Sequence, residues 1–315
     1  MKSSITVLAP ATSANLGAGF DVFGVALDCL HDSVRASISP SKGVRLRVSG
    51  LGSSSIPLDP VRNTAGIVAR ELLSLAGTGS GLEVSIKKGI EPGWGLGSSA
   101  ASAAATAVAV NELLELGLSP LELVAAAAKG EVASAGAPHA DNVAPSILGN
   151  FTIVRSYDPL DVVRLTCPRR VEFVVFMPDI KKKDTAAMRA VLPSKLHLSQ
   201  LVYNVGRAAT FAAGVALGDI DLMGKGMSDA VVEGARARLY PGLPQAKEEI
   251  MSSGAMGVAI SGAGPSLIAL VANRKQGLDV SRTGVDAFER QGIPCRSFST
   301  RPALGAQVVD SRDHS

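Results

Sequence analysis

The chain has 315 residues, of which 46% are apolar, 19% are charged and 4% are aromatic. This composition excludes a disordered chain and predicts a core of aliphatic side chains and alanine, and the length suits two domains. The net charge of +3 comes without a long basic tract or interleaved aromatic residues. We therefore expect no nucleic-acid partner, whereas small anionic ligands fit the mild positive balance.

The first half of the chain is predicted to alternate between strands and helices. Alternating or short apolar runs predict strands at residues 5–10, 20–28, 34–38, 44–49, 82–88 and 150–156. Helical patterns with start and stop signals predict helices at residues 63–75, 98–116 and 119–133. The segment between the last of these helices and the strand at 150 is expected to be a loop.

The second half is predicted to mix helices and strands in the same way. Strands are expected at residues 171–178, 256–260 and 266–271, helices at 185–192 and 198–218, and a last helix and two short strands close the chain. Prolines interrupt the pattern near residues 156–168, so we expect domains at 1–160 and 161–315 that share an interface.

The cysteines and the N-terminus indicate the compartment. Cys29, Cys167 and Cys295 are far apart in the sequence and form neither a CxxC nor a metal-ligand spacing, which indicates reduced thiols. The N-terminus lacks the apolar segment of a signal peptide, and the mild run at 100–110 is too short to span a bilayer. We expect a cytoplasmic protein without a membrane partner.

The stretch EPGWGLGSSAAS, residues 91–102, carries the clearest chemical signal. Its alternate glycines let the backbone approach an anion, and the free N–H groups at the start of the following helix attract one. A Walker phosphate loop is excluded, because Gly97 is followed by Ser98 instead of lysine. A tight turn with serine as a simple helix cap is the structural alternative, and the three glycines with two serines favour phosphate.

The same stretch also matches a dinucleotide-binding fingerprint over residues 95–100. That fingerprint needs an acidic residue about 20 positions later, at the end of a second parallel strand. At that distance stand Glu112 and Glu115, which fall in or at the end of the predicted helix. A nicotinamide-dependent oxidoreductase is therefore disfavoured, and a phosphate site of another kinase type is favoured.

Residues 92–101 resemble the second motif of the GHMP kinases, residues 8–28 the first and residues 261–270 the third. The order and spacing agree, so the resemblance covers almost the whole chain. It implies an α+β, two-domain GHMP-kinase fold. The N-terminal domain would be ribosomal-protein-S5-domain-2-like, and the C-terminal domain a ferredoxin-like α/β sandwich.

The first motif, TSANLGAGFD at residues 12–21, is similar to the homoserine kinases within that family; galactokinases and mevalonate kinases carry a Gly-Glu-His version. Residues 138–145, 185–193 and 233–242 resemble the same group. The resemblance implies ATP-dependent phosphorylation of L-homoserine to O-phospho-L-homoserine, a step of threonine biosynthesis. Alternatives are another small-molecule kinase of the family (mevalonate- or shikimate-type), a non-catalytic ligand-binding relative and, remotely, the oxidoreductase.

The resemblance also assigns residues to the substrate. It implies substrate-binding roles for Asn15, Asp21, His139, Asp141, Arg189 and Arg236, and catalytic roles for Asn15, Asp21, Glu131, Asn142 and Arg189. An amino acid needs a carboxylate against its ammonium and an arginine fork against its carboxylate. Taken alone, these residues would be ordinary turn or surface residues, and Arg238 is a nearby rival to Arg236.

ATP and Mg²⁺ are the cofactors that the resemblance implies. It assigns nucleotide binding to Asn63, Pro92, Gly93, Trp94, Gly95, Leu96, Gly97, Ser98, Ser99, Ala100, Ser102, Gly262 and Gly264, and Mg²⁺ to Glu131 with Ser98 or Ser99. A helix-capping role explains Asn63 nearly as well. Trp94 either packs on the nucleotide or covers the loop.

The general base is the open point of the predicted mechanism. Some relatives use an aspartate with a nearby lysine, whereas this chain has Asn142 at that place, and an amide cannot accept the proton. Asp141 is adjacent. We expect direct in-line transfer without a dedicated base, because positioning and charge neutralisation carry most of phosphoryl transfer. The resemblance also allows a homodimer.

Overall fold

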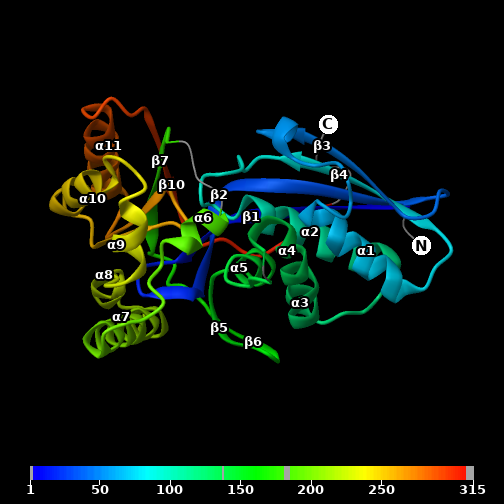
Figure 1. The fold of residues 1–315 in the computed structure, drawn as a ribbon, viewed down its shortest axis with the longest axis horizontal. Helices are drawn as coiled ribbons and strands as arrows, with labels where there is room; N and C mark the ends of the chain where they lie inside the picture. Colours follow the sequence, from blue (N-terminus) through cyan, green and yellow to red (C-terminus); the bar gives the residue numbers. More distant parts are fainter. Residues whose placement is uncertain (1–2, 137, 181–184, 310–315) are drawn as a thin grey trace.

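The computed structural model describes residues 3–136, 138–180 and 185–309, which build two sheets side by side (Figure 1). The first sheet has seven strands in the order β11-β1-β2-β4-β3, with β5 paired to β2 and β6 paired to β5. Its strands are β1 (Ser4–Asn15), β2 (Gly19–Ser39), β3 (Val44–Gly50), β4 (Gly81–Lys88), β5 (Phe151–Tyr157), β6 (Leu160–Leu165) and β11 (Gln307–Val309).

β2 is a single strand of 21 residues that links the two ends of this sheet. It pairs with β1 along its length, with β5 near its start and with β4 near its end. The prediction of two separate strands, at 20–28 and 34–38, was wrong. The polar residues His31 and Asp32 suggested a break, but β1 supplies a partner through this region and Asp32 is buried against Lys88.

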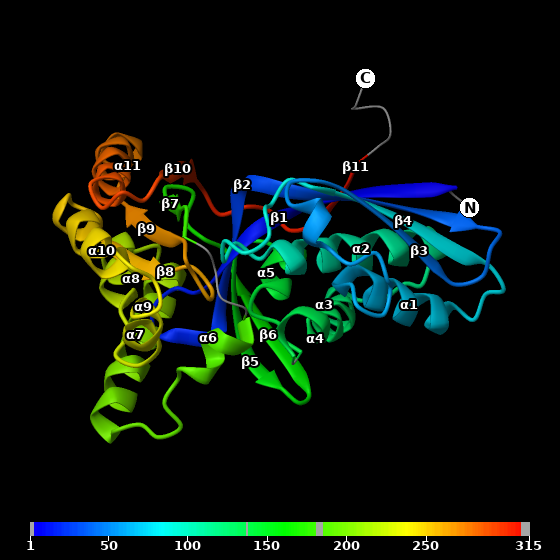
Figure 2. The ribbon, with the colours of Figure 1, turned by 45° about the horizontal axis from the view of Figure 1, so that its top comes forward.

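Helices cover one face of the first sheet, as Figures 1 and 2 show. They are α1 (Thr64–Ala76), α2 (Ser98–Leu114), α3 (Pro120–Gly130), α4 (Val132–Ala135) and α5 (Val143–Leu148), preceded by a 3₁₀ turn, η1 (Ser53–Ser55). Asn63 caps α1, and Ser119 with Glu122 forms a capping box for α3, as the start signals predicted. The loop predicted before residue 150 was wrong in part, because it contains α4 and α5.

α2 lies in the middle of the helical layer, and its alanine-rich composition allows it to pack closely on the sheet. Most of its alanines are fully buried, and the helix contacts both β1 and β2. Small side chains allow a helix axis to approach a sheet closely without leaving voids. The alanine-rich sequence therefore places the N-terminus of α2 against the first two strands.

The second sheet is antiparallel, with its four strands in the order β10-β7-β9-β8. The strands are β7 (Glu172–Pro178), β8 (Gly257–Ile260), β9 (Leu267–Val271) and β10 (Cys295–Thr300). The helices are α6 (Thr185–Ala190), α7 (Leu198–Leu217), α8 (Ile220–Gly226), α9 (Val232–Ala237), α10 (Leu243–Ser252) and α11 (Arg274–Glu289). If the four strands are numbered by their order in the chain, their order in the sheet is 4-1-3-2, which is the ferredoxin-like order. The predicted α+β fold is therefore confirmed.

The two sheets share a hydrophobic core. Phe23 of β2 and Phe151 of β5 pack on Phe211 of α7, with ring centroids 5.0–5.8 Å apart. The domain limit between residues 160 and 161 stays a prediction. β6 pairs with β5 in the first sheet, which supports a domain limit after Leu165. β11 pairs with β1, so the C-terminal segment belongs to the first domain as well. No helix in the described part of the chain is long and apolar enough to cross a membrane.

Candidate active site

The three sequence motifs meet where the two sheets adjoin. The backbone N–H of Thr12 donates to the carbonyl of Leu96 (3.1 Å), which ties the glycine loop to β1. The hydroxyl of Ser261 donates to the carbonyl of Gly95 (2.7 Å), and the N–H of Gly262 donates to the carbonyl of Ala14 (3.0 Å). Segments from the beginning, the middle and the end of the chain thus form one structural unit.

The glycine loop is shaped by conformation and by close packing. Gly93, Gly95 and Gly97 have positive φ angles of 93°, 73° and 65°. A Cβ atom on Gly97 would lie 1.9 Å from Oγ1 of Thr12, so the loop could not reach β1 with another residue there. Gly97 precedes α2, whose first N–H groups have no acceptor within the helix and favour an anion together with the helix dipole.

A cavity of about 260 Å³ opens in front of this helix end. Its lining consists of Asn15, Asp21, Pro92, Gly93, Gly95, Leu96, Gly97, Ser98, Ser99, Ala100, Glu131, His139, Asp141, Asn142, Arg189, Arg236, Gly262 and Ala263. All but Ala263 are residues that the sequence analysis assigned to catalysis or to binding of substrate, nucleotide or metal. The structure therefore gathers most of the predicted site around one space.

Asn63 and Ser102 lie elsewhere, in the lining of a second cavity of about 250 Å³. This cavity shares Pro92, Ser98 and Ser99 with the first, so the two spaces adjoin at the start of α2. The side chain of Asn63 accepts from the N–H of Gly66 (3.2 Å) and thus serves as the helix cap. Its position in the lining is compatible with a second role toward a nucleotide.

Trp94 and Gly264 line neither cavity. Trp94 packs against the core, and the guanidinium of Arg296 from β10 lies 5.7 Å from its ring centroid. Arg296 also pairs with Glu91 (3.2 Å), so one arginine of the second sheet contacts the glycine loop at two positions near its start. Gly264 packs against Tyr240, where a Cβ atom would lie 2.6 Å from the ring. Nucleotide contacts of Trp94 and Gly264 stay predictions.

The charged groups assigned to the substrate gather at one end of the first cavity. Nη2 of Arg189 donates to both carboxylate oxygens of Asp21, at 2.7 and 2.8 Å. Arg189 comes from α6, which lies where the two halves of the molecule meet (Figures 1 and 2). Arg189 and Arg236 both pack on the ring of Phe20, with their guanidinium carbons 5.3 and 5.1 Å from its centroid. Two cations and one anion are thus held together around an aromatic ring.

Hydrogen bonds fix the backbone of this region. The amide of Asn15 donates to the carbonyl of Gly262 (2.8 Å) and accepts from the N–H of Asp21 (3.1 Å). Arg236 is buried and donates to the same carbonyl (3.0 Å). Asn15 and Asp21 both have positive φ angles, 75° and 58°, which non-glycine residues rarely adopt. The surrounding contacts hold this unusual loop in place.

Burial shifts the pKa values of the neighbouring groups. Burial, followed by the charges of Asp21 and Glu131, raises the pKa of Asp141 to about 7. Burial and then the charge of Arg189 lower the pKa of His139. Burial also raises the pKa of Tyr157, whose hydroxyl donates to the backbone carbonyl of Asp21 (2.8 Å). Near neutral pH, His139 is therefore mostly uncharged and Asp141 is close to its titration point.

The two loop serines have different partners. Oγ of Ser98 donates to the carbonyl of Ile90 (2.7 Å), a structural bond within the loop. Oγ of Ser99 donates to a carboxylate oxygen of Glu131 (3.0 Å), and both residues line the first cavity. A hydroxyl beside a buried carboxylate fits a hard cation such as Mg²⁺, which takes few protein oxygens and completes its shell with phosphate and water. The donor set favours Ser99 over Ser98.

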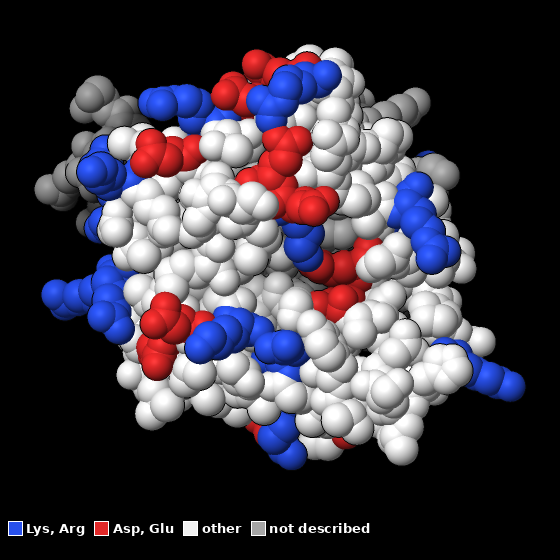
Figure 3. Space-filling model, turned by 90° about the vertical axis from the view of Figure 1, so that its left-hand side faces the viewer, with Lys and Arg blue, Asp and Glu red and all other residues white. Residues whose placement is uncertain are grey.

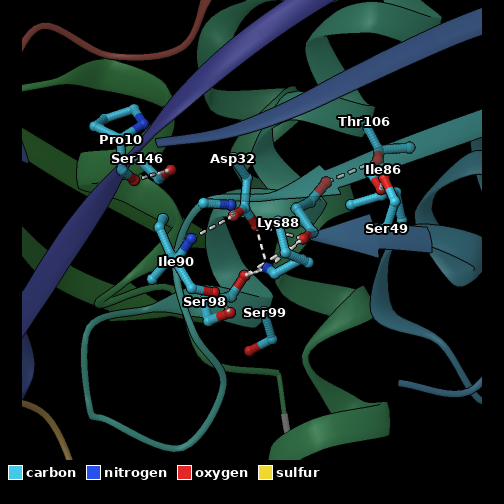
Figure 4. A network of polar contacts seen from close by, with 12 residues as sticks. Pro10, Asp32, Ser49, Ile86, Lys88, Ile90, Ser98, Ser99, Thr106 and Ser146 are labelled. Carbon is cyan, nitrogen blue, oxygen red and sulfur yellow. Dashed lines mark hydrogen bonds and ion pairs between the residues drawn. The ribbon is translucent and has the colours of Figure 1, made fainter. Parts of the chain in front are cut away.

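Asp32 and Lys88 form a buried ion pair beneath the glycine loop that the sequence analysis missed (Figure 4). The ammonium of Lys88 also donates to the carbonyl of Ser98 (2.7 Å) and to Oγ of Ser102 (2.8 Å). Asp32 accepts from the N–H groups of Gly89 and Ile90, both at 3.1 Å. The pair ties β2 and β4 to the first turn of α2. The available signals were Lys88, next to the glycine loop, and Asp32, between two predicted strands.

Comparison with known proteins agrees with this geometry. The family model for the GHMP kinase N-terminal domain matches residues 62–150, and that for the C-terminal domain matches residues 211–284. Homoserine kinases from Haloarcula marismortui and Natronomonas pharaonis are 45% and 44% identical over 306 and 304 residues, covering 96% of this chain and 99% of each relative.

A crystal structure of homoserine kinase from Cytophaga hutchinsonii matches the fold with a TM-score of 0.93 at 37% identity, covering 98% of both chains. Sequence, fold and the meeting of the three motifs therefore agree over nearly the full length. The chain belongs to the GHMP kinase family.

Proposed function

We propose that the protein transfers the terminal phosphoryl group of ATP to the hydroxyl of L-homoserine, which gives O-phospho-L-homoserine on the route to threonine. The observation that carries this proposal is one cavity lined both by the N-terminus of α2, which suits a phosphate, and by the Asp21–Arg189 pair with Arg236. The relatives named homoserine kinase support the same substrate.

ATP is proposed to bind with its phosphates at the start of α2. The helix N-terminus and the glycine loop suit the phosphates, and the adjoining second cavity suits the nucleoside. Ser99 and Glu131 would hold Mg²⁺, which neutralises charge on the phosphates when it is bound. The ammonium of Lys88 lies next to Ser98 and supports the same end of the helix.

Homoserine is proposed to bind at the opposite end of the first cavity. Its carboxylate would face Arg189 and Arg236, because guanidinium groups bind carboxylates through parallel hydrogen bonds. Its ammonium would face Asp21 and Asn15, with His139 and Asp141 completing the wall. This orientation directs the hydroxyl toward the glycine loop.

Transfer is proposed to proceed in line, without a dedicated base. The hydroxyl of Thr12 donates to the side-chain carbonyl of Asn142 (2.8 Å), which fixes the amide at the cavity wall. An amide cannot take up a proton, so Asn142 would orient the substrate hydroxyl. The remaining contribution is positioning of two bound substrates and stabilisation of phosphate charge.

A cytoplasmic location, a homodimer and the absence of a nucleic-acid partner remain proposals. The three described cysteines are free, which fits a reducing compartment. On the face in Figure 3, acidic and basic side chains are interspersed among wide uncharged areas. The helix α7 exposes Leu198, Val202 and Val205, at 74%, 65% and 59%, an apolar face that a second copy would cover.

The function is tested by ADP release with purified protein, Mg²⁺–ATP and one alcohol at a time. Homoserine, mevalonate, galactose and shikimate are compared by kcat/KM. We expect clear preference for homoserine. A preference for any of the other three would contradict the proposal.

A further inference from the structure

Asp21 and Arg189, which lie 168 residues apart in the sequence, are paired with each other across the cavity. Both line the space assigned to the substrate, and their side chains are 26% and 32% exposed. The sequence analysis assigned one to the ammonium and the other to the carboxylate of the substrate. Each of the two side chains therefore binds the charged group of the other that the substrate would use.

This pairing leaves part of the arginine unsatisfied. Both hydrogen bonds to Asp21 come from Nη2, whereas the buried Nε has no hydrogen-bond partner within the described ranges. A guanidinium binds a carboxylate best through two parallel bonds, one from each of two nitrogens. A carboxylate that reached Nε and Nη2 together would satisfy the group that Asp21 leaves unpaired.

Other contacts hold Asp21 and Arg189 in place independently of the ion pair between them. The N–H and carbonyl of Asp21 are bonded to Asn15 (3.1 Å) and Tyr157 (2.8 Å), so its backbone is fixed independently of Arg189. The guanidinium of Arg189 packs over Phe20, 5.3 Å from the ring centroid. The ion pair is thus the contact that a ligand can replace while these supporting contacts persist.

We propose that the Asp21–Arg189 ion pair occupies the positions of the substrate's charged groups. When the zwitterionic amino acid binds, this one ion pair is replaced by two ion pairs with the substrate. The carboxylate of the amino acid takes the place of Asp21 on Arg189, and its ammonium takes the place of Arg189 on Asp21. This inference rests on the proposed function and adds a specificity mechanism to it. An alcohol with only one charge would have to break the pair and leave one member without a partner, which is costly in a partly desolvated site.

The test uses three alcohols that differ only in charge: homoserine, 4-hydroxybutyrate with the carboxylate alone, and 3-aminopropan-1-ol with the ammonium alone. The dissociation constant of each is measured by titration calorimetry with a non-hydrolysable ATP analogue and Mg²⁺ present, and kcat/KM by ADP release. For the wild type we expect both single-charge alcohols to lose at least about 100-fold in kcat/KM, as in sites that leave a polar group unpaired.

The decisive variant is Asp21→Asn, which frees Arg189 while it keeps the side-chain shape. It should bind 4-hydroxybutyrate about tenfold more tightly than the wild type does, because no ion pair has to be broken, while homoserine binds more weakly. If Asp21 and Arg189 instead bound the substrate independently of each other, Asp21→Asn would not bind 4-hydroxybutyrate more tightly than the wild type. The matched control is Asp141→Asn at pH 8, which removes another negative charge from the cavity and leaves the pair intact.

Arg189→Gln gives an independent measurement, since it should improve binding of 3-aminopropan-1-ol over the wild type. The proposed exchange is contradicted if Asp21→Asn does not bind 4-hydroxybutyrate, and Arg189→Gln does not bind 3-aminopropan-1-ol, more tightly than the wild type. It is also contradicted if Asp141→Asn tightens the binding of 4-hydroxybutyrate as much as Asp21→Asn does. Failure of the proposed function gives a different result: wild-type protein would not phosphorylate homoserine at all. Circular dichroism verifies that each variant is folded before it is titrated.

Discussion

Replacing Lys88 by methionine should destabilise the protein strongly, because it leaves a carboxylate buried without its cation. The side chains of Lys88 and Asp32 are 2% and 0% exposed. Removing one partner of a buried ion pair costs about 3–5 kcal/mol. The carboxylate keeps three donors, the N–H groups of Gly89 and Ile90 and the hydroxyl of Ser102, so we expect about 3 kcal/mol.

The double variant Lys88→Met/Asp32→Asn separates the charge effect from packing. It removes both charges, and its free energy of unfolding should recover by about 2 kcal/mol over the single variant, since neutral replacements of buried pairs are tolerated. Activity should recover less. The carbonyl of Ser98 still lacks its donor, so the start of α2 stays less well held and the KM for ATP stays raised.

Urea unfolding, followed by circular dichroism and by the fluorescence of the single tryptophan, measures these differences. Coincident curves from the two probes establish that one transition is observed. The reasoning is refuted if Lys88→Met loses less than about 1 kcal/mol, the range of an exposed pair. It is also refuted if the double variant is no more stable than the single one.

Three further predictions follow from the site. Because the pKa of Asp141 is raised from 3.8 to about 7, its buried carboxylate destabilises the fold increasingly from pH 4 to 7. The difference in unfolding free energy between Asp141→Asn and the wild type, measured in urea, should therefore change in favour of the variant by about 2 kcal/mol or more from pH 5 to pH 8.5. A difference that does not depend on pH would contradict this. Ser99→Ala should raise the Mg²⁺ concentration for half-maximal activity about tenfold, and Ser98→Ala much less; the reverse order would assign the metal to Ser98. Arg296→Ala should shift the emission of Trp94 to the red and raise the KM for ATP a few-fold, as loss of about 1 kcal/mol predicts, whereas unchanged emission would show that Arg296 does not hold the ring.

The parts of the site that were predictable are those encoded by local sequence. The helix start after Gly97 and the caps at Asn63 and Ser119 depend on a few neighbouring residues, and all three lie where the sequence indicated. The family resemblance, over the three motifs and further segments, identified the residues of the first cavity except Ala263, although it gave no distances between them.

The contacts that were missed join residues far apart in the sequence. Asp32 meets Lys88 only because β2 and β4 pair, and Phe20 contacts two arginines only because α6 and α9 come to the same loop. The pairing of Asp21 with Arg189 is likewise a product of the interface between the two halves. No local pattern carries such information.

A crystal structure with homoserine, Mg²⁺ and a non-hydrolysable ATP analogue is the most direct test of the proposed reaction. We expect the carboxylate on Arg189 and Arg236, the ammonium on Asp21, and the hydroxyl oxygen about 3–3.5 Å from the terminal phosphorus atom, as near-attack geometry requires. Homoserine bound outside this cavity, or with its hydroxyl turned away from the glycine loop, would contradict it.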